Sequence, residues 1–186
     1  MEVKLKEIYS EDFLAYFGDK SDLVGNIVVD SEATSVDVEK IIDSIGINQK
    51  ETKLETHSGK FNSDEYTIYV NRSEPKVRQR FTQAHELGHC VLGHKGESAR
   101  LINSANYRLH ERLNERAANQ FAAELLMPKY YIKKSIEKLL FEKSMTATDL
   151  PKYSVKEFIT YLANDLDVSK QSMEYRLLNL GVIRNV

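Results

Sequence analysis

Two histidines that lie four residues apart, His85 and His89, enclose a glutamate in the segment HELGH. In an α-helix, residues four apart project from the same face, so both imidazole rings are expected to point at one spot. A pair of neutral imidazoles can bind Zn²⁺ at about 2.0–2.1 Å per nitrogen. Glu86 lies roughly 100° further round the helix, where its carboxylate would reach a water on the metal and act as a general base. The spacing therefore predicts a zinc site with hydrolytic chemistry.

A segment this short also arises by chance in helices that carry two ordinary histidines, so a third ligand has to be found elsewhere. Catalytic zinc sites use three protein ligands plus a water, and two histidines with one glutamate form one known set. The long helix predicted over 110–126 offers Glu115 for this purpose. Asn119 shares the face of Glu115, and the pair resembles the E-x-x-x-D pattern of metallopeptidases. The resemblance implies that Asn119 supports the ligand without touching the metal.

Small residues near these positions favour close packing of the two ligand helices. Gly88 leaves no side chain between the two histidines, and Ala118 and Ala122 would let the second helix approach. Glu111 and Glu124, by contrast, are expected to be ordinary surface charges.

Three further residues with metal-binding side chains receive no ligand role. In the H-E-x-x-H-x-x-G-x-x-H pattern of metzincin peptidases, the position of the third histidine is occupied here by Lys95. His94 is therefore expected to be a residue at the helix C-terminus, favoured there by the helix dipole. His57 is interpreted as a partly exposed residue near a strand turn, and Cys90 as a small packed apolar residue.

The composition is that of a globular protein in a reducing compartment. Of the 186 residues, 41% are hydrophobic and 29% are charged, which suits one domain with a proper core. The formal net charge of −2 offers no basic field for nucleic acid or an anionic membrane. No apolar run approaches the ~20 residues of a membrane span, the N-terminus has no apolar signal segment, and the single cysteine excludes an internal disulfide framework. We therefore expect a cytoplasmic protein with no membrane partner.

Helical and extended patterns follow one another in a way that predicts an α+β fold. Strand-like sequence over 53–71, with a turn at Ser58-Gly59, precedes the helix that carries the two histidines. We predict a small, mostly antiparallel sheet packed on this active-site helix, a second helix that carries the third ligand, and a C-terminal helical annex. The expected helices are 10–17, 35–45 with Ser35 as N-cap, 76–92, 110–126, 128–140, 154–165 and 169–180, and 23–29 is expected to be extended.

The chain is predicted to divide near residue 143. Residues 1–143 would form the catalytic domain, in which 1–30 is an N-terminal extension without an assigned role. Residues 144–186 would form the annex, packed on the same domain. The two helices of the annex also fit a helix-turn-helix, but acidic and basic residues nearly balance there, which is a poor electrostatic footprint for DNA. A packing role is therefore preferred, and direct binding of nucleic acid is not expected.

Two segments, RQRFTQAHELGH and the later NERAANQFAAELLMP, together resemble the ImmA/IrrE family of metallopeptidases. The strand sequence IYVN and the segment VDVEKIIDSIGI are also similar to that family, so the resemblance covers about 36–127. It implies His85, His89 and Glu115 as zinc ligands and Glu86 as the catalytic glutamate. It also implies a cytoplasmic protein. Several members lie beside helix-turn-helix repressors that they cleave or help inactivate, in mobile elements and stress responses.

These observations predict a zinc-dependent metallopeptidase that cleaves a regulatory protein, such as a repressor, through a zinc-activated water. Tyr107 and His110, in or next to the segment between the two ligand helices, are candidates for stabilising the oxyanion. The alternative is a non-catalytic, zinc-containing regulatory or binding module of a mobile element or a toxin–antitoxin-like system. Glu86 argues against this alternative, because a purely structural zinc site needs no base and has no open position. A third hypothesis, a DNA-binding regulator, would show binding that weakens with salt.

Overall fold

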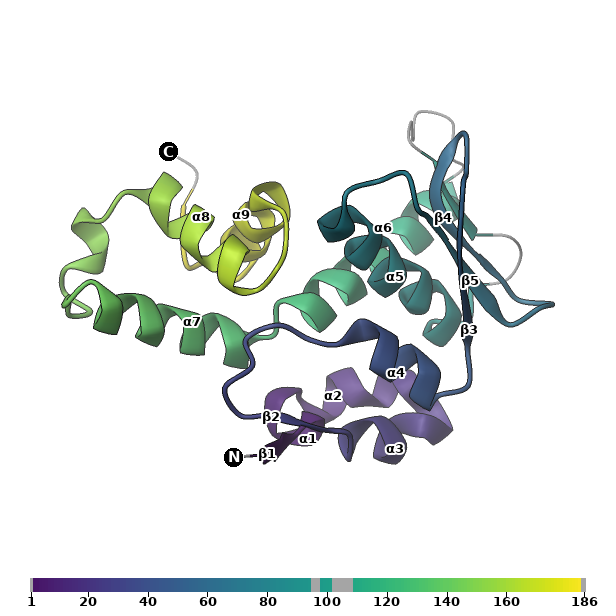
Figure 1. Ribbon diagram of the computed structural model, residues 1–186, viewed down its shortest axis with the longest axis horizontal. Coiled ribbons are helices and arrows are strands. Elements are labelled where there is room, and N and C mark those ends of the chain that lie inside the picture. Colours follow the sequence, from purple (N-terminus) through teal and green to yellow (C-terminus); the bar gives the residue numbers. More distant parts are fainter. Residues whose placement is uncertain (1, 95–97, 102–108, 185–186) are drawn as a thin grey trace.

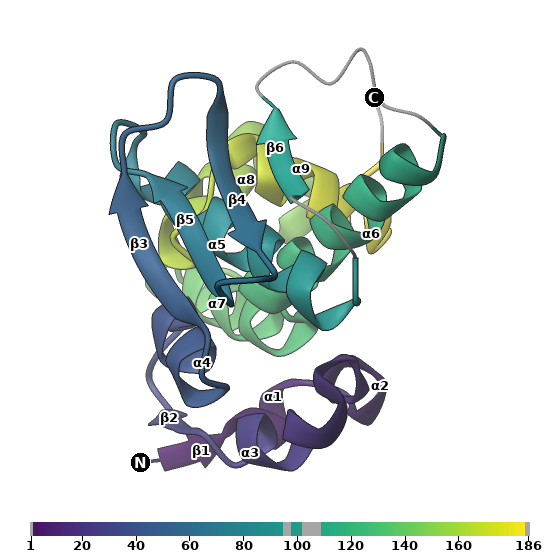
Figure 2. The same ribbon diagram turned by 90° about the vertical axis from the view of Figure 1, so that its right-hand side faces the viewer.

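Helix α5 (Lys76–Val91) lies against a four-stranded sheet, and a second long helix, α6 (Leu109–Leu126), packs on α5 (Figure 1). The structure is a computed structural model and describes residues 2–94, 98–101 and 109–184. In the side view of Figure 2 the strands follow in the order β3, β5, β4, β6. The β3–β5 pair is parallel and the other two pairs are antiparallel, so the predicted α+β fold with a mostly antiparallel sheet is confirmed. The strands are β3 (Asn48–Thr52), β4 (His57–Asn62), β5 (Thr67–Asn71) and β6 (Ser98–Leu101).

The inner face of the sheet is apolar and packs on α5. Phe61 on β4 pairs with Ile68 on β5, and both side chains are buried, as is that of Val70. Ala84 and Leu87 of α5 are fully buried and belong to the same hydrophobic cluster. The sheet therefore covers one side of the helix that carries the two histidines.

Gly59 lies inside β4, so the turn predicted at Ser58-Gly59 is wrong. The chain turns instead at 63–66, where Tyr66 has a φ of 49°. The glycine is needed for packing, because a Cβ at Gly59 would lie 2.3 Å from Cγ2 of Thr82 and 2.7 Å from a backbone carbonyl oxygen of β5. A glycine within a strand can mark a close approach as well as a turn, and here it lets β4 lie directly on α5.

The N-terminal residues form a cluster of short helices below the sheet, drawn in purple in Figure 1. Ser10 caps α2, because its Oγ accepts a hydrogen bond from the backbone N of Phe13 at 3.3 Å. The prediction that 23–29 is extended holds from Val28 onward but is wrong for Leu23, which lies in α3. The elements are β1 (Glu2–Lys4), paired antiparallel with β2 (Val28–Asp30), and α1 (Leu5–Ile8), α2 (Glu11–Leu14), η1 (Ala15–Lys20) and α3 (Ser21–Gly25).

Helix α4 (Val38–Ser44) begins later than predicted. The carboxylate of Asp37 accepts a hydrogen bond from the backbone N of Lys40 at 2.9 Å, so Asp37 is the N-cap and the prediction of Ser35 is wrong. Serine and aspartate are comparable caps. The burial of Val36 ahead of the helix favours Asp37, because Asp37 is the next exposed polar residue.

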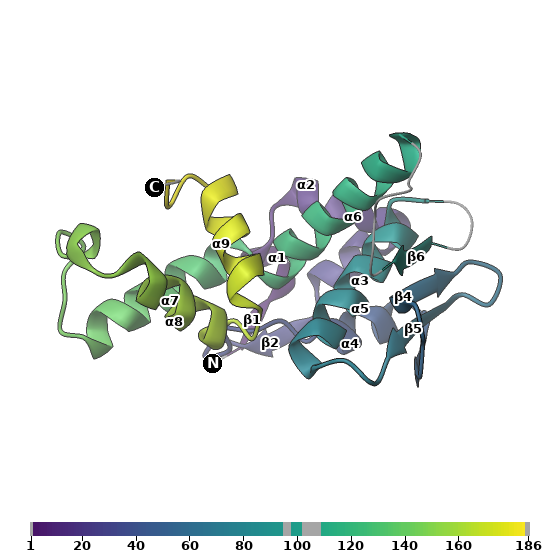
Figure 3. The ribbon, with the colours of Figure 1, turned by 90° about the horizontal axis from the view of Figure 1, so that it is seen from above.

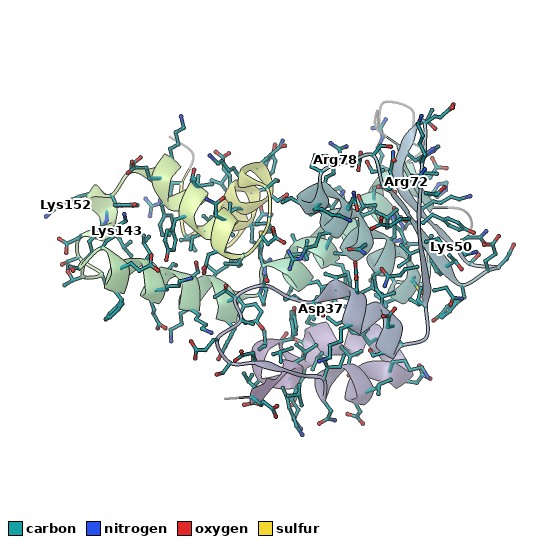
Figure 4. All side chains as sticks on the ribbon, in the orientation of Figure 1. Asp37, Lys50, Arg72, Arg78, Lys143 and Lys152 are labelled. Carbon is teal, nitrogen blue, oxygen red and sulfur yellow. The ribbon has the colours of Figure 1, made fainter. Side chains whose placement is uncertain are left out.

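The C-terminal helices leave the end of α6 and fold back toward α5, as the view from above shows (Figure 3). Lys143 and Lys152 lie at the distant end of this part, where α7 connects to α8 (Figure 4). Ser154 and Ser169 cap the last two helices, since the Oγ of each accepts a hydrogen bond from a backbone N in the first turn. The elements are α7 (Lys129–Glu142), η2 (Leu150–Lys152), α8 (Val155–Asp165) and α9 (Lys170–Asn179).

Arg80 connects α5 to two distant parts of the chain. Its Nη1 donates to the carbonyl oxygens of Leu166 and Asp167 at 3.1 and 2.8 Å, just after the end of α8. Its Nη2 donates to the carbonyl oxygen of Val36 at 2.7 Å, just before α4. Burial lowers the pKa of Arg80 from its ordinary value, but a guanidinium stays charged at neutral pH. These bonds join the C-terminal helices to α5, while the division of the chain at residue 143 stays a prediction.

One hydrophobic cluster runs through all parts of the fold, from Val3 in the N-terminal strand through Leu87 on α5 to Leu177 on α9. Within the described ranges, no helix has both the length and the apolar character that crossing a bilayer requires.

Replacing Arg80 by methionine is expected to lower the free energy of unfolding by about 1.5–3 kcal/mol, because three backbone carbonyl oxygens lose a charged donor. Urea denaturation of the full chain measures this change. Arg72→Met is the control, since Arg72 follows β5 and is exposed (Figure 4), and its substitution should change stability by less than about 0.5 kcal/mol. Equal midpoints for both variants would show that Arg80 does not hold these segments together.

Candidate metal centre

Helix α5 places the two histidines of the HELGH segment side by side in the protein interior. His85 and His89 are 0% and 2% exposed, and their Nε2 atoms lie 3.0 Å apart. The rings meet edge to face, with centroids 4.7 Å apart. The i, i+4 spacing predicted from the sequence therefore directs both Nε2 atoms to one point.

Helix α6 brings Glu115 to the same point. Its Oε2 lies 3.2 Å from Nε2 of His85, and its Oε1 lies 3.1 Å from Nε2 of His89. The carboxylate thus spans the two imidazoles from the opposite helix. The structure brings together the three residues that the sequence suggested as ligands, and their assignment as ligands stays a prediction.

The approach of α6 depends on small residues at the contact, as the sequence indicated. A Cβ at Gly88 would lie 3.0 Å from Cδ1 of Phe121 and 3.3 Å from backbone atoms of Ala118. Ala118 and Ala122 are fully buried. A larger residue at position 88 would push α6 outward and carry Glu115 away from the histidines.

The carboxyl group of Glu115 is held in its charged form. Partial burial acts to raise its pKa, but hydrogen bonds with His85 and His89 lower it more strongly, to about 2. Glu115 is therefore a carboxylate across the physiological pH range and can act as an anionic ligand.

The three donors fit a divalent transition metal. Two imidazole nitrogens and a carboxylate oxygen converge within 4.8 Å of one another, and no other described group of histidine, cysteine, aspartate and glutamate does so. In a tetrahedral site with metal–ligand distances of about 2.0–2.1 Å, donors would be about 3.3–3.4 Å apart. The observed separations of 3.0–3.2 Å are close to this value. Imidazole and carboxylate donors together suit zinc and its neighbours in the first transition row.

Glu86 lies next to His85 but does not join the three converging donors. Its side chain is fully buried on the side of α5 that faces β4, where a Cβ at Gly59 would lie 3.5 Å from Cγ of Glu86. The helix and the strand thus fix this carboxylate beside the histidine pair. Its predicted role, close to the metal without binding it, is compatible with this position and stays a prediction.

His94 contacts the site, which the sequence reasoning missed. Its Nδ1 lies 2.8 Å from Nδ1 of His89, the ring nitrogen that faces away from Glu115. Burial, followed by the nearby His89, lowers the pKa of His94, so the favourable dipole interaction expected of a charged histidine is not supported. The signal that could have found it is the order H-x-x-x-G-H, because a glycine that ends a helix folds the next residue back onto the last turn.

Asn119 does not support Glu115 in the way that was predicted. It is exposed, and in the described part of the chain no hydrogen bond joins it to the three converging residues. The line of contact with α5 runs instead through Ala118 and Ala122, which turns Asn119 toward solvent.

Of the two residues suggested for stabilising the oxyanion, His110 is exposed, and Tyr107 lies outside the described residues.

Cys90 and His57 stay outside the site. Cys90 is partly buried and shares a hydrogen bond with Tyr66 on the sheet side of α5, and burial raises the pKa of its thiol. His57 lies on β4, where its Nδ1 is 2.7 Å from Oγ1 of Thr56. Both positions agree with the structural roles expected from the sequence.

Comparison with known proteins gives two matches. Residues 42–178 match the model of the IrrE N-terminal-like domain, Peptidase_M78. A segment of 96 residues is 34% identical to the radiation response metalloprotease IrrE of Deinococcus radiodurans, covering 50% of this chain and 29% of that relative. The chain thus spans less than a third of the length of this relative, whereas the family match runs from α4 to α9 and includes the metal centre.

Glu115→Ala is expected to lower zinc affinity by more than the ~10–100-fold typical of changes around a metal ligand, because one of three donors is lost. Competition with a chromophoric chelator measures the affinity, and elemental analysis gives the metal content. Glu124→Ala is the control, since Glu124 lies on the same helix, outside the converging group. Equal retention of metal by the two variants would show that the ligand assignment is wrong.

Cys90→Ala is expected to retain its metal and most of its activity, because the thiol packs toward Tyr66 and not toward the donors. Metal content after purification measures this. Loss of zinc from this variant would mean that sulfur belongs to the site.

Proposed function

Because the chain belongs to the IrrE N-terminal-like domain family, a metallopeptidase domain, we propose that it is a zinc-dependent peptidase that cleaves a regulatory protein. The observation that carries this proposal is the convergence of His85, His89 and Glu115 on one point, with Glu86 beside them. Two histidines and one glutamate are a known ligand set of catalytic zinc sites. The similarity to a metalloprotease over half of the chain supports the same reaction class.

The four residues divide the work of hydrolysis between them. His85, His89 and Glu115 would hold the metal, which when bound supplies the Lewis acidity that polarises a carbonyl and acidifies water. Glu86 accepts the proton of the attacking water and delivers it to the nitrogen of the leaving amine. Its fixed place between α5 and β4 supports this role, since a general base must be held within hydrogen-bond reach of the proton that it takes.

A different class of function is a binding module with a structural zinc ion. Structural zinc sites are closed by four protein ligands, whereas catalytic sites keep a position for water or substrate. Within the described residues three donors converge, and a buried carboxylate that is not a donor lies next to them. This arrangement favours the enzyme over the binding module.

We propose a helix-turn-helix repressor or a comparable cytoplasmic regulator as the substrate. The sequence resemblance supports this choice, and the relative from Deinococcus radiodurans is named a radiation response metalloprotease. The lone thiol of Cys90 fits a reducing compartment. We assign no DNA-binding role to α8 and α9, because the turn between them is bonded to Arg80 of α5.

Glu86→Gln separates the enzyme from the binding module. The variant keeps the size of the side chain but removes the base, so it should bind zinc, fold and associate with its target while cleavage falls by ~10²–10⁴-fold. Where a repressor gene lies next to the gene of this protein, cleavage is followed on that repressor with and without chelator. In cells, cleavage is followed by counting new protein N-termini by mass spectrometry.

Glu124→Gln provides the matched control for this experiment, since it makes the same chemical change on α6 outside the converging group. A Glu86→Gln protein that is fully competent in the cell would contradict the peptidase. A Glu86→Gln protein that captures an uncut target would support it and identify the substrate.

A further inference from the structure

The two ring nitrogens of His89 have separate partners. Its Nε2 faces Glu115 at 3.1 Å and His85 at 3.0 Å, within the proposed metal centre. Its Nδ1 lies 2.8 Å from Nδ1 of His94, a histidine that the proposed function does not use. The centroids of the rings of His89 and His94 are 4.9 Å apart, and the rings are inclined by 67°.

The end of α5 produces this contact. Gly93 has a φ of 67°, its N donates to the carbonyl oxygen of Cys90 at 3.1 Å, and the N of His94 donates to the carbonyl oxygen of His89 at 3.0 Å. This pair of bonds is the Schellman motif, which places the third residue after the last helical residue against the third residue from the end of the helix. His94 and His89 occupy those two positions. The motif that ends the helix therefore also sets His94 against the ligand.

A single proton between the two Nδ1 atoms decides which nitrogen of His89 can bind metal. A neutral imidazole carries one N–H, so a lone pair on Nε2 requires the proton on Nδ1. Nδ1–H of His89 then donates to Nδ1 of His94, which accepts only as a neutral ring with its own proton on Nε2. The opposite tautomer would aim an N–H of His89 at the metal centre and would leave His94 to donate.

We propose that His94 is a positioning residue that holds His89 in the tautomer and orientation required for metal binding. This inference rests on the proposed function, because it assigns His89 as a ligand. Metal-binding histidines commonly donate their second N–H to a carboxylate or a backbone carbonyl. A neutral imidazole in that place orients the ring without adding negative charge, so the bound metal keeps more of its Lewis acidity.

Two substitutions separate the hydrogen bond from the packing contact. His94→Leu keeps an apolar side chain against the last turn, which suits the Schellman motif, but removes the acceptor. His94→Asn restores an acceptor near the position of Nδ1. His57→Leu is the control, because it removes a histidine on β4 that lies outside the converging group.

Zinc affinity should fall by ~10–100-fold in His94→Leu, recover most of that loss in His94→Asn and stay unchanged in His57→Leu. The midpoint of urea unfolding of the metal-free protein should be similar in all four proteins. An unchanged zinc affinity in His94→Leu, or an equal loss in His94→Leu and His94→Asn, would overturn the inference.

The nitrogen NMR shifts of the His94 ring provide a second measurement that needs no variant of position 94 to fold. In the zinc-loaded wild-type protein they should show His94 as a neutral ring protonated at Nε2, with Nδ1 as the acceptor of the bond from His89. Protonation of His94 at Nδ1 would overturn the inference while leaving the proposed function intact. A wild-type protein that binds no zinc would overturn the proposed function itself.

Discussion

The close packing of α5 on α6 at Gly88 is the contact on which the site depends. His85 and His89 lie on either side of this glycine along α5, and Glu115 lies one turn before Ala118 along α6. Backbone and ring atoms of α6 lie 3.0–3.3 Å from where a Cβ at position 88 would be. Any side chain larger than that of glycine at this position would therefore push the two helices apart. The donors converge because the helices touch at this point, so packing and metal geometry have the same cause.

Further contacts keep α5 in place on its other sides. The sheet lies against it through β4, where the missing side chain of Gly59 allows contact with Thr82 and Glu86. Near the start of the helix, Arg80 binds the carbonyl oxygens that follow α8 and precede α4. At its other end, the turn through Gly93 folds His94 onto His89. A site built on a helix supported in this way can hold its donors within the small tolerances that metal binding and proton transfer need.

The sequence predicted the parts of this arrangement that follow from helical periodicity. The spacing of His85 and His89 and the small residues at the helix contact derive from one repeat of 3.6 residues, whereas the choice of Glu115 rests on the resemblance to metallopeptidase patterns. The same rule failed for Asn119. This residue is four positions after Glu115, but it is rotated away from the line along which Ala118 and Ala122 contact α5. Helices as short as α1 and α2 show no readable period. The strand position of Gly59 and the contact of His94 with His89 depend on neighbours or turns that periodicity does not describe.

Arg80 also bears on how this architecture can change in evolution. Its guanidinium donates hydrogen bonds to backbone carbonyl oxygens of two segments, one before and one after α5 in the sequence. Backbone carbonyls are present whatever the side chains are, so the sequences of α8, α9 and the segment before α4 can diverge without losing this bond. Replacement of all the C-terminal helices by those of a relative is more constrained. The new helices must place a helix end where α8 ends, or the partly buried guanidinium of Arg80 loses two of its hydrogen-bond acceptors. The bond from Arg80 therefore restricts the location of the end of α8 and not the side chains there, whereas the buried residues of α8 and α9 are restricted by packing in the core.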